Sequence, residues 1–174
     1  MAKNERVNVN ALSKRLLHRL QSLEMKLATA ESCTGGLVAA ALTEIPGSSE
    51  VFERGFLTYS NESKVEMLGV REATISEFGA VSEEVAREMA LGAVGRSGAN
   101  VAVAVTGVAG PGGSGLKPEG RVCFAVAFDD RVISRQTDFG ALGRSRVRQS
   151  SVKRALELVL AVTEADRAGA GHPG

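Results

Sequence analysis

One short run, Asn100 to Val105 (NVAVAV), constrains the fold of this chain more than any other segment. Small and β-branched residues alternate in it, which predicts a strand buried inside a sheet. The run ends in a loop with many glycines, Thr106 to Gly115 (TGVAGPGGSG). This loop is too rich in glycine to pack and too long for a minimal turn, so we expect it to line a site. The alternative is a flexible crossover.

Predicted helices and strands alternate through the rest of the chain. The strand candidates are 26–30, 55–60 and the two arms of a hairpin, 122–128 and 132–137. The helical patterns are 9–23, a stretch ending at residue 43, 61–68, two between 71 and 98, and 144–162. This order predicts an α/β fold, a three-layer α/β/α sandwich with a mixed sheet. Loops beyond the carboxyl ends of the strands make the site in such sheets, so we expect a pocket between the glycine-rich loop and the small-residue turn at 31–36.

The length and charge of the chain set its class. With 174 residues it is long enough for one compact domain, which we place at residues 1–164, followed by a flexible tail at 165–174. Its 21 Lys and Arg residues nearly balance 20 Asp and Glu residues, so we expect no nucleic-acid partner. No apolar run approaches the roughly 20 residues that span a bilayer, and the N-terminus is polar. We therefore expect a cytoplasmic protein with no membrane partner.

Neither a metal nor a cofactor is expected. Cys33 and Cys123 are far apart with no CxxC spacing, which suits reduced thiols better than a disulfide or a zinc site. His18 lies in a helical pattern, and His172 lies in the glycine-rich end of the chain. We expect neither histidine to be a metal ligand.

A first group of candidate site residues lies in the turn Glu31 to Gly36 (ESCTGG), between a predicted strand and a predicted helix. A hydroxyl at such a turn lies beside the unpaired N–H groups of the helix, which can hold an oxyanion or a phosphate. Ser32 is then a candidate nucleophile, with Thr34, Gly35 and Gly36 beside the substrate. The alternative is that Ser32 or Thr34 only caps the helix.

A second group is Tyr59 to Lys64 (YSNESK), where a strand passes into a helix. A lysine acts as a general base only if burial or a nearby positive charge lowers its pKa, and a tyrosine hydroxyl can relay the proton. Because no suitable histidine is present, a serine with a lysine is the simplest nucleophile and base. The alternative for Lys64 is a surface lysine in the first turn of a helix.

Arg144 and Arg148 form a third group. They are four residues apart and share one helix face, so they can grip a phosphate with forked hydrogen bonds. Arg146 and Lys153 lie nearby in the sequence, and a solvated basic face is the alternative.

These residues belong to longer motifs that resemble a known family. The motifs are AESCTGG (30–36), PGSSEVFERGFLTYSNESK (46–64), GAVSEEVAREMA (79–90), TGVAGPGG (106–113) and GRSRVR (143–148). They occur in the order found in the nicotinamide-nucleotide amidase family, also known as the C-terminal domain of CinA. The resemblance covers the chain from about Val9 to Val162. It implies a stand-alone enzyme without the larger N-terminal domain of full-length CinA proteins.

The resemblance implies hydrolysis of nicotinamide mononucleotide to nicotinic acid mononucleotide and ammonia, a step of pyridine-nucleotide recycling, by a serine/lysine mechanism. By position, the catalytic group would be Ser32, Ser49, Tyr59 and Lys64. The substrate would lie along Thr106, Gly107, Ala109 and Gly110, with its phosphate at Arg144 and Arg148. Ser32 is the first choice as nucleophile. Ser49 is the alternative if the turn beside Ser32 binds the phosphate or the oxyanion instead.

The implied partners are a small nucleotide substrate and further copies of the same chain in a homo-oligomer. Two other functions compete with hydrolysis. A binding module could sense the nucleotide without turnover, but it would not need Ser32, Tyr59 and Lys64 together. An interaction protein in competence or DNA damage would be expected to carry a basic stripe or a stacking platform, and the sequence has neither.

Overall fold

The sheet has five strands and mixed direction. The computed structural model of the chain describes residues 2–169, with side chains described over residues 9–165. The strands are β1 (Leu27–Glu31), β2 (Phe52–Leu57), β3 (Val101–Gly107), β4 (Arg121–Phe128) and β5 (Arg131–Asp138). They lie in the order β2-β1-β3-β4-β5. β1 runs parallel to β2 and β3, whereas β4 pairs antiparallel with β3 and β5. The predicted mixed sheet is confirmed.

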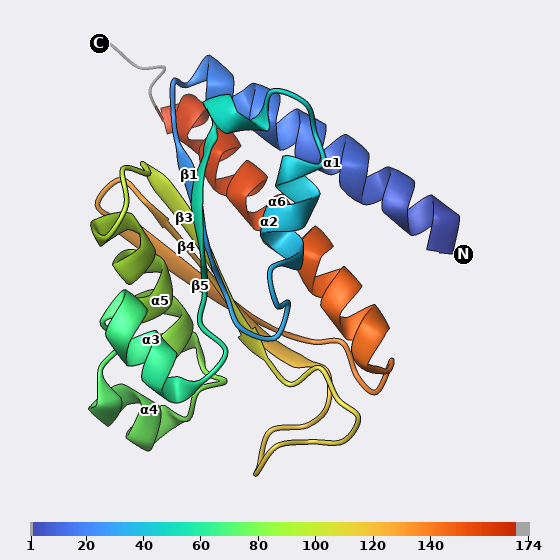
Figure 1. Ribbon diagram of the computed structural model, residues 1–174, viewed down its shortest axis with the longest axis vertical. Coiled ribbons are helices and arrows are strands. Elements are labelled where there is room, and N and C mark those ends of the chain that lie inside the picture. Colours follow the sequence, from blue (N-terminus) through green and yellow to red (C-terminus); the bar gives the residue numbers. More distant parts are fainter. Residues whose placement is uncertain (1, 170–174) are drawn as a thin grey trace.

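Helices cover both faces of this sheet. They are α1 (Ala2–Ser22), α2 (Leu37–Thr43), the 3-10 helix η1 (Ser48–Glu50), α3 (Asn61–Leu68), α4 (Glu72–Phe78), α5 (Glu83–Gly95) and α6 (Arg144–Gly169). α1, α2 and α6 lie on one side of the strands, and α3, α4 and α5 lie on the other (Figure 1). The predicted three-layer α/β/α sandwich is therefore confirmed.

The alternation along β3 explains why the two faces differ. Val101, Val103 and Val105 belong to the core beneath α1, α2 and α6, which also contains Phe124. The alanines of the same strand face the other core, where alanines of β1 and β4 join them beneath α5. Successive side chains of a strand point to opposite faces. Because small side chains line this second face, α5 can pack close to the sheet.

Several boundaries differ from the predictions. α1 begins at Ala2 rather than at residue 9, and α6 continues to Gly169 rather than ending at residue 162. The apolar periodicity is confined to the middle of each helix, so it could not reveal the polar turns at the ends. Of the expected tail, residues 170–174 lie outside the described residues, as does His172.

The candidate site lies at one edge of the sheet. β1, β2 and β3 end at this edge, β4 begins there, and α2 and α6 begin beside it. The loop between β3 and β4 projects from the same edge, at the bottom of Figure 1. Parallel neighbours bring their carboxyl-terminal loops together, which places the turn at 31–36 near the segment at 58–64. Within the described residues, no helix is both long and apolar enough to cross a membrane.

Candidate active site

Ser32 and Lys64 meet at the carboxyl ends of β1 and β2. The distance between Ser32 Oγ and Lys64 Nζ is 3.1 Å. Both side chains are buried, with 8% of Ser32 and 1% of Lys64 exposed. Ser32 follows β1 directly, and Lys64 lies in the first turn of α3, which Ser60 caps by accepting a hydrogen bond from the N–H of Ser63. The alternative of a surface lysine is wrong.

Among the residues that the structure describes, the amine of Lys64 has only neutral hydrogen-bond partners. It lies 2.8 Å from the carbonyl oxygen of Thr58, 3.3 Å from that of Tyr59 and 3.4 Å from that of Ser60. Burial lowers the pKa of Lys64 below its ordinary value, and the nearby Cys33 and Glu62 oppose this shift. A buried amine without a carboxylate contact favours the neutral form. The neutral form has a lone pair that can accept the proton of the Ser32 hydroxyl.

Cys33 follows the serine but is a poor nucleophile. Burial raises the pKa of its thiol to about 12. Only the thiolate attacks, and little of it exists near neutral pH when the pKa lies so high. The hydroxyl of Ser32, in contrast, has the amine of Lys64 at 3.1 Å.

Glu31 occupies the N-terminus of α2. Its carboxylate accepts hydrogen bonds from the N–H groups of Gly36 at 3.1 Å, Val38 at 3.0 Å and Ala39 at 2.8 Å. We expected these N–H groups to be free for an oxyanion or a phosphate, and that expectation is wrong, because an internal anion takes them. The alternative, that Ser32 or Thr34 only caps the helix, is wrong too, since the N-cap residue is Gly36 and no local side chain caps it.

Two other N–H groups of the turn stay available. The N–H of Ser32 donates to the carbonyl of Val105 at 2.9 Å, and that of Gly35 donates to the carbonyl of Ser32 at 3.0 Å. Among the described residues, the N–H groups of Cys33 and Thr34 have no hydrogen-bond acceptor in another residue. They directly follow the serine, which is where N–H groups stabilise the oxyanion of an acyl-transfer reaction.

Tyr59 turns away from the serine and the lysine. Its side chain is 60% exposed, and its hydroxyl accepts a hydrogen bond from Arg144 Nη2 at 2.8 Å. Arg144 Nη1 also donates to the carbonyl of Gly110 at 3.0 Å. No hydrogen bond of the described residues joins the Tyr59 hydroxyl to Ser32 or Lys64. Arg144 therefore links Tyr59 to the glycine-rich loop.

Arg148 of α6 contacts the turn at 31–36, the candidate nucleophile turn. Its Nη2 donates to the carbonyl of Thr34 at 3.1 Å, whereas the hydroxyl of Thr34 is buried without a partner among the described residues. A Cβ at Gly35 would lie 3.2 Å from Arg148 Nη2. Gly35 and Gly36 both have positive φ angles, of 60° and 93°. Glycine at these two positions lets the turn adopt its conformation beside the guanidinium.

Of the four loop residues expected along the substrate, Gly110 alone has a hydrogen bond to another predicted site residue, Arg144, in the described part of the chain. The hydroxyl of Thr106 donates to the carbonyl of Ala80, between α4 and α5, at 2.8 Å, so its proton is already used in a hydrogen bond. Gly107 pairs with Val122 as the last residue of β3, and Ala109 is buried in the core. The predicted loop is present, but its first residues extend the sheet.

Glu119 ties this loop to the start of α6. One carboxylate oxygen accepts from the N–H of Gly112 at 2.7 Å, and the other accepts from the N–H of Gly143 at 3.3 Å. The carboxylate packs on Gly110, where an added Cβ would lie 2.4 Å from it. Because Arg144 follows Gly143, the hydrogen bond from Gly143 to Glu119 also fixes the position of Arg144 at the start of α6.

Ser49 does not belong to this cluster within one chain. It lies in η1 and is exposed, three residues before β2 begins. The register pairs Phe52 with Leu27, the first residues of two parallel strands, whereas Ser32 follows the last residue of β1. A strand of this length spans about 20 Å. The expected group of Ser32, Ser49, Tyr59 and Lys64 is corrected accordingly.

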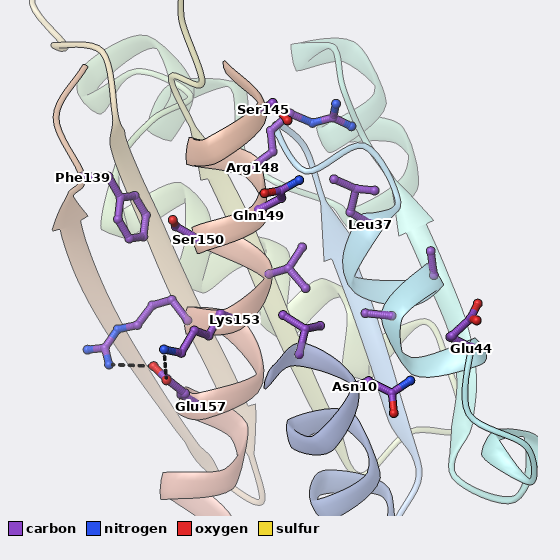
Figure 2. A pocket seen from close by; sticks show the side chains of 15 residues that line it. Asn10, Leu37, Glu44, Phe139, Ser145, Arg148, Gln149, Ser150, Lys153 and Glu157 are labelled. Carbon is purple, nitrogen blue, oxygen red and sulfur yellow. Dashed lines mark ion pairs between the residues drawn. The ribbon is translucent and has the colours of Figure 1, made fainter. Parts of the chain in front are cut away.

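A groove of about 980 Å³ lies outside this cluster, between α1, α2 and α6. Figure 2 shows Leu37 of α2 facing Arg148 and Gln149 of α6 across it, with Asn10 of α1 at its lower end. Ser32, Lys64 and Tyr59 do not line it. It is therefore not the pocket that we expected between the two glycine-rich segments. The groove borders the turn at 31–36 through Leu37, which follows Gly36, and through Arg148, which donates to the carbonyl of Thr34.

Glu31 and Glu119 were not predicted from the sequence as site residues. Glu31 stands beside Ser32 in the motif AESCTGG, but its hydrogen bonds reach five to eight residues along the chain, beyond any capping pattern. Glu119 follows the loop at a distance of seven residues from Gly112. The one available signal was an acidic residue flanking each small-residue segment.

Comparisons of the sequence and of the structure find similar known proteins. The chain matches the family described as CinA C-terminal domain over residues 9–163. It is 47% identical to the nicotinamide-nucleotide amidohydrolase PncC of Enterobacter agglomerans, covering 86% of this chain and 96% of that protein. Among solved structures, the competence/damage inducible protein CihA of Agrobacterium tumefaciens is similar, with a TM-score of 0.86 and 48% identity over 88% of this chain and 94% of that one.

Other relatives are longer. The chain is 55% identical to a CinA-like protein of Chloroherpeton thalassium over 67% of its own length but only 28% of that protein. A CinA superfamily protein of Escherichia coli has a similar structure, with a TM-score of 0.86 at 35% identity over 88% of this chain and 90% of that one. The chain thus spans about a quarter of some curated relatives and nearly all of others.

Proposed function

Because the chain belongs to the CinA C-terminal domain family, we propose that it is an amidohydrolase acting on a pyridine nucleotide. The substrate is nicotinamide mononucleotide, and the products are nicotinic acid mononucleotide and ammonia. Ser32 is the nucleophile and Lys64 is the general base. The relative named PncC supports the reaction class.

One observation carries the proposal. A serine hydroxyl lies 3.1 Å from a buried lysine amine whose pKa burial lowers. A nucleophile in hydrogen-bond contact with a base is the geometry that activates a hydroxyl. The second supporting feature is the pair of N–H groups of Cys33 and Thr34, which can receive the negative charge that develops on the carbonyl oxygen.

The first half-reaction forms an acyl enzyme. Neutral Lys64 accepts the hydroxyl proton while Ser32 Oγ bonds to the carboxamide carbon, and the carbonyl electron pair moves onto the oxygen. The tetrahedral intermediate then collapses and the C–N bond breaks. The Lys64 ammonium gives its proton to the leaving nitrogen, so ammonia departs and the lysine is neutral again.

The second half-reaction returns the serine. Lys64 accepts a proton from water while the water oxygen bonds to the acyl carbon. Collapse breaks the bond to Ser32 Oγ, which recovers its proton from Lys64. The carboxylic acid product ionises in solution, and the enzyme is restored.

The phosphate of the substrate belongs at the other end of the site. Arg144 presents its guanidinium to two neutral oxygens and makes no ion pair among the described residues. A guanidinium in this state can bind phosphate with forked hydrogen bonds. Arg148 is the weaker candidate, because the carbonyl of Thr34 already takes one of its N–H groups.

We place this activity in the cytoplasm, with the chain acting as a homo-oligomer. Both remain predictions. Analytical ultracentrifugation of the purified chain measures the second, and a single monomer species at micromolar concentration would contradict it.

The proposed function is tested by measuring ammonia release from nicotinamide mononucleotide. Wild-type protein should release one ammonia for each nicotinic acid mononucleotide formed, and Ser32→Ala should release none above background. Ser49→Ala is the matched control, because it removes the same atom at the opposite edge of the sheet. Binding of the nucleotide by wild type without any ammonia release would refute the enzyme and leave a sensor of the nucleotide.

A further inference from the structure

Glu31 is a buried carboxylate beside the nucleophile. Only 1% of it is exposed, and it makes no ion pair among the described residues. Burying a charge is costly unless hydrogen bonds replace the lost water. Its three backbone N–H donors, from Gly36, Val38 and Ala39, supply them. Because burying this carboxylate is costly and Glu31 directly precedes Ser32, we infer that Glu31 has a role beyond packing.

The helix that Glu31 caps cannot be capped locally. α2 has only seven residues, and a helix of this length is marginal without stabilising contacts. Its N-cap is Gly36 in the left-handed conformation, which carries no side chain to accept a hydrogen bond. The cap therefore comes from the last residue of β1, on the far side of the nucleophile turn.

This remote cap closes the chain from residue 31 to residue 39 into a ring that contains Ser32. The carboxylate fixes the end of the ring at α2. The bond from the N–H of Ser32 to the carbonyl of Val105 fixes the end at the sheet. With both ends held, the turn keeps Ser32 Oγ facing Lys64 Nζ at 3.1 Å and leaves the N–H groups of Cys33 and Thr34 unoccupied.

We propose that Glu31 is a positioning residue for the nucleophile: its carboxylate spans the turn, holds Ser32 against Lys64, and fills the positive end of α2 so that no substrate anion binds there. This inference rests on the proposed function only in taking Ser32 as the nucleophile. Glu31 touches no reacting atom, and it acts through the backbone of the turn.

Glu31→Gln tests the proposal with little change in shape. A glutamine amide has one acceptor oxygen, and its NH₂ group is a donor that would face a backbone N–H of α2. At least one of the three hydrogen bonds is lost, and the turn loosens. Small misplacements of reacting groups lower rates by about 100-fold. We expect kcat to fall roughly 10-fold to 100-fold while KM for the nucleotide stays within about threefold, because phosphate binding is elsewhere.

A readout without the nucleotide separates positioning from binding. A fluorophosphonate, which phosphonylates activated serines and releases fluoride, reports the reactivity of Ser32 alone. Peptide mass spectrometry measures the rate at which Ser32 is labelled. We expect Glu31→Gln to slow labelling by the same factor as kcat. Ser82→Ala is the matched control, since it removes the cap of α5 on the other face of the sheet and leaves the nucleophile turn untouched.

A second variant covers the case in which Glu31→Gln does not fold. Ala39→Pro deletes the N–H that makes the shortest of the three bonds, at 2.8 Å, and keeps the Glu31 carboxylate, although the proline ring also restricts the backbone of Val38. Residue 39 lies in the first turn of α2, where the backbone N–H has no partner within the helix. We expect slower labelling of Ser32, by a smaller factor than in Glu31→Gln.

The outcomes distinguish the inference from the proposed function. Equal labelling rates in wild type and in a folded Glu31→Gln overturn the inference alone, as does a raised KM with unchanged kcat. If Glu31→Gln does not fold, labelling of Ala39→Pro at the wild-type rate overturns it. Failure of the wild type to label at Ser32 overturns the proposed nucleophile, and the positioning role with it.

Discussion

The helices α2 and α6 begin at the same edge of the sheet with opposite charge at their N-termini. At α2 the carboxylate of Glu31 accepts three backbone N–H groups. At α6 the first five residues include Arg144, Arg146 and Arg148, and the first turn has no acidic residue. A helix N-terminus carries a partial positive charge. The protein neutralises that charge at α2 and adds to it at α6.

This difference indicates that the N-termini of α2 and α6 have different roles in the site. The proposed nucleophile, Ser32, lies beside the helix end that Glu31 already fills, so on this proposal no anion would compete there with a neutral carboxamide. None of the three arginines makes an ion pair among the described residues, so the start of α6 remains the attractive place for a phosphate. Tyr59, bonded to Arg144, lies between the two regions.

The largest expected effect is on the nucleophile side. Lys64→Met removes the base and keeps an unbranched side chain of similar length in a buried position. We expect kcat to fall by about 10²- to 10⁴-fold. The double variant with Ser32→Ala should lose no more than Ser32→Ala alone, because the two residues act as a unit. Steady-state ammonia release measures both, and additive losses would show that the two residues act separately.

The phosphate side is sharpened by comparing substrates. Arg144→Ala should raise KM for nicotinamide mononucleotide about 10-fold to 100-fold, the value of a charged hydrogen bond of about 1.5 to 3 kcal/mol. With nicotinamide riboside, which lacks the phosphate, the same variant should change kcat/KM little. Arg146→Ala is the matched control, because it removes an equal charge from the same turn of α6 but not the hydrogen bonds to Tyr59 and Gly110. Equal losses with both substrates would place the phosphate elsewhere.

The pH dependence follows from Lys64. Burial lowers its pKa below 10.5, against the influence of Cys33 and Glu62. Since only the neutral amine accepts a proton, kcat/KM should rise with pH through the lowered pKa and then level off. Between that pKa and 10.5 the unfolded chain binds more protons than the folded one, so the free energy of unfolding should also rise with pH in this window. Urea unfolding at several pH values should show this rise in wild type and a smaller one in Lys64→Met.

The smallest effect is expected at Ser49. Its hydroxyl lies at the opposite edge of the sheet from Ser32 and is exposed. Surface substitutions away from special features change stability by less than about 0.5 kcal/mol. Ser49→Ala should therefore keep both the wild-type kcat and the wild-type midpoint of urea unfolding. Loss of turnover in this variant would mean that a second copy of the chain brings its Ser49 to the site.

The fold was largely predictable because its cues are local. The predicted run at 100–105 forms β3 from Val101 onward, although β3 continues to Gly107, and the predicted hairpin is present as β4 and β5. Each of these elements is indicated by a pattern within about ten residues of sequence. The alternation of valine and alanine in β3 also determined which core each side chain entered.

The site was predictable only in part, because its geometry depends on pairing between distant segments. Ser32 and Lys64 were paired through motifs, and the structure places them 3.1 Å apart. The same motifs placed Ser49 with them, since a motif does not reveal at which end of a parallel strand a residue lies. Glu31 was missed because a carboxylate that caps a helix across a turn has no sequence period.

The central claim is that Ser32 carries the acyl group, and rapid acid quenching tests it most directly. Protein mixed with nicotinamide mononucleotide is quenched within a turnover, digested and examined by peptide mass spectrometry. The peptide containing Ser32 should gain the mass of the nucleotide less one ammonia, and Ser32→Ala should show no such peptide. Ammonia release without any acylated peptide, or acylation of Ser49 or Cys33 instead, would contradict the claim.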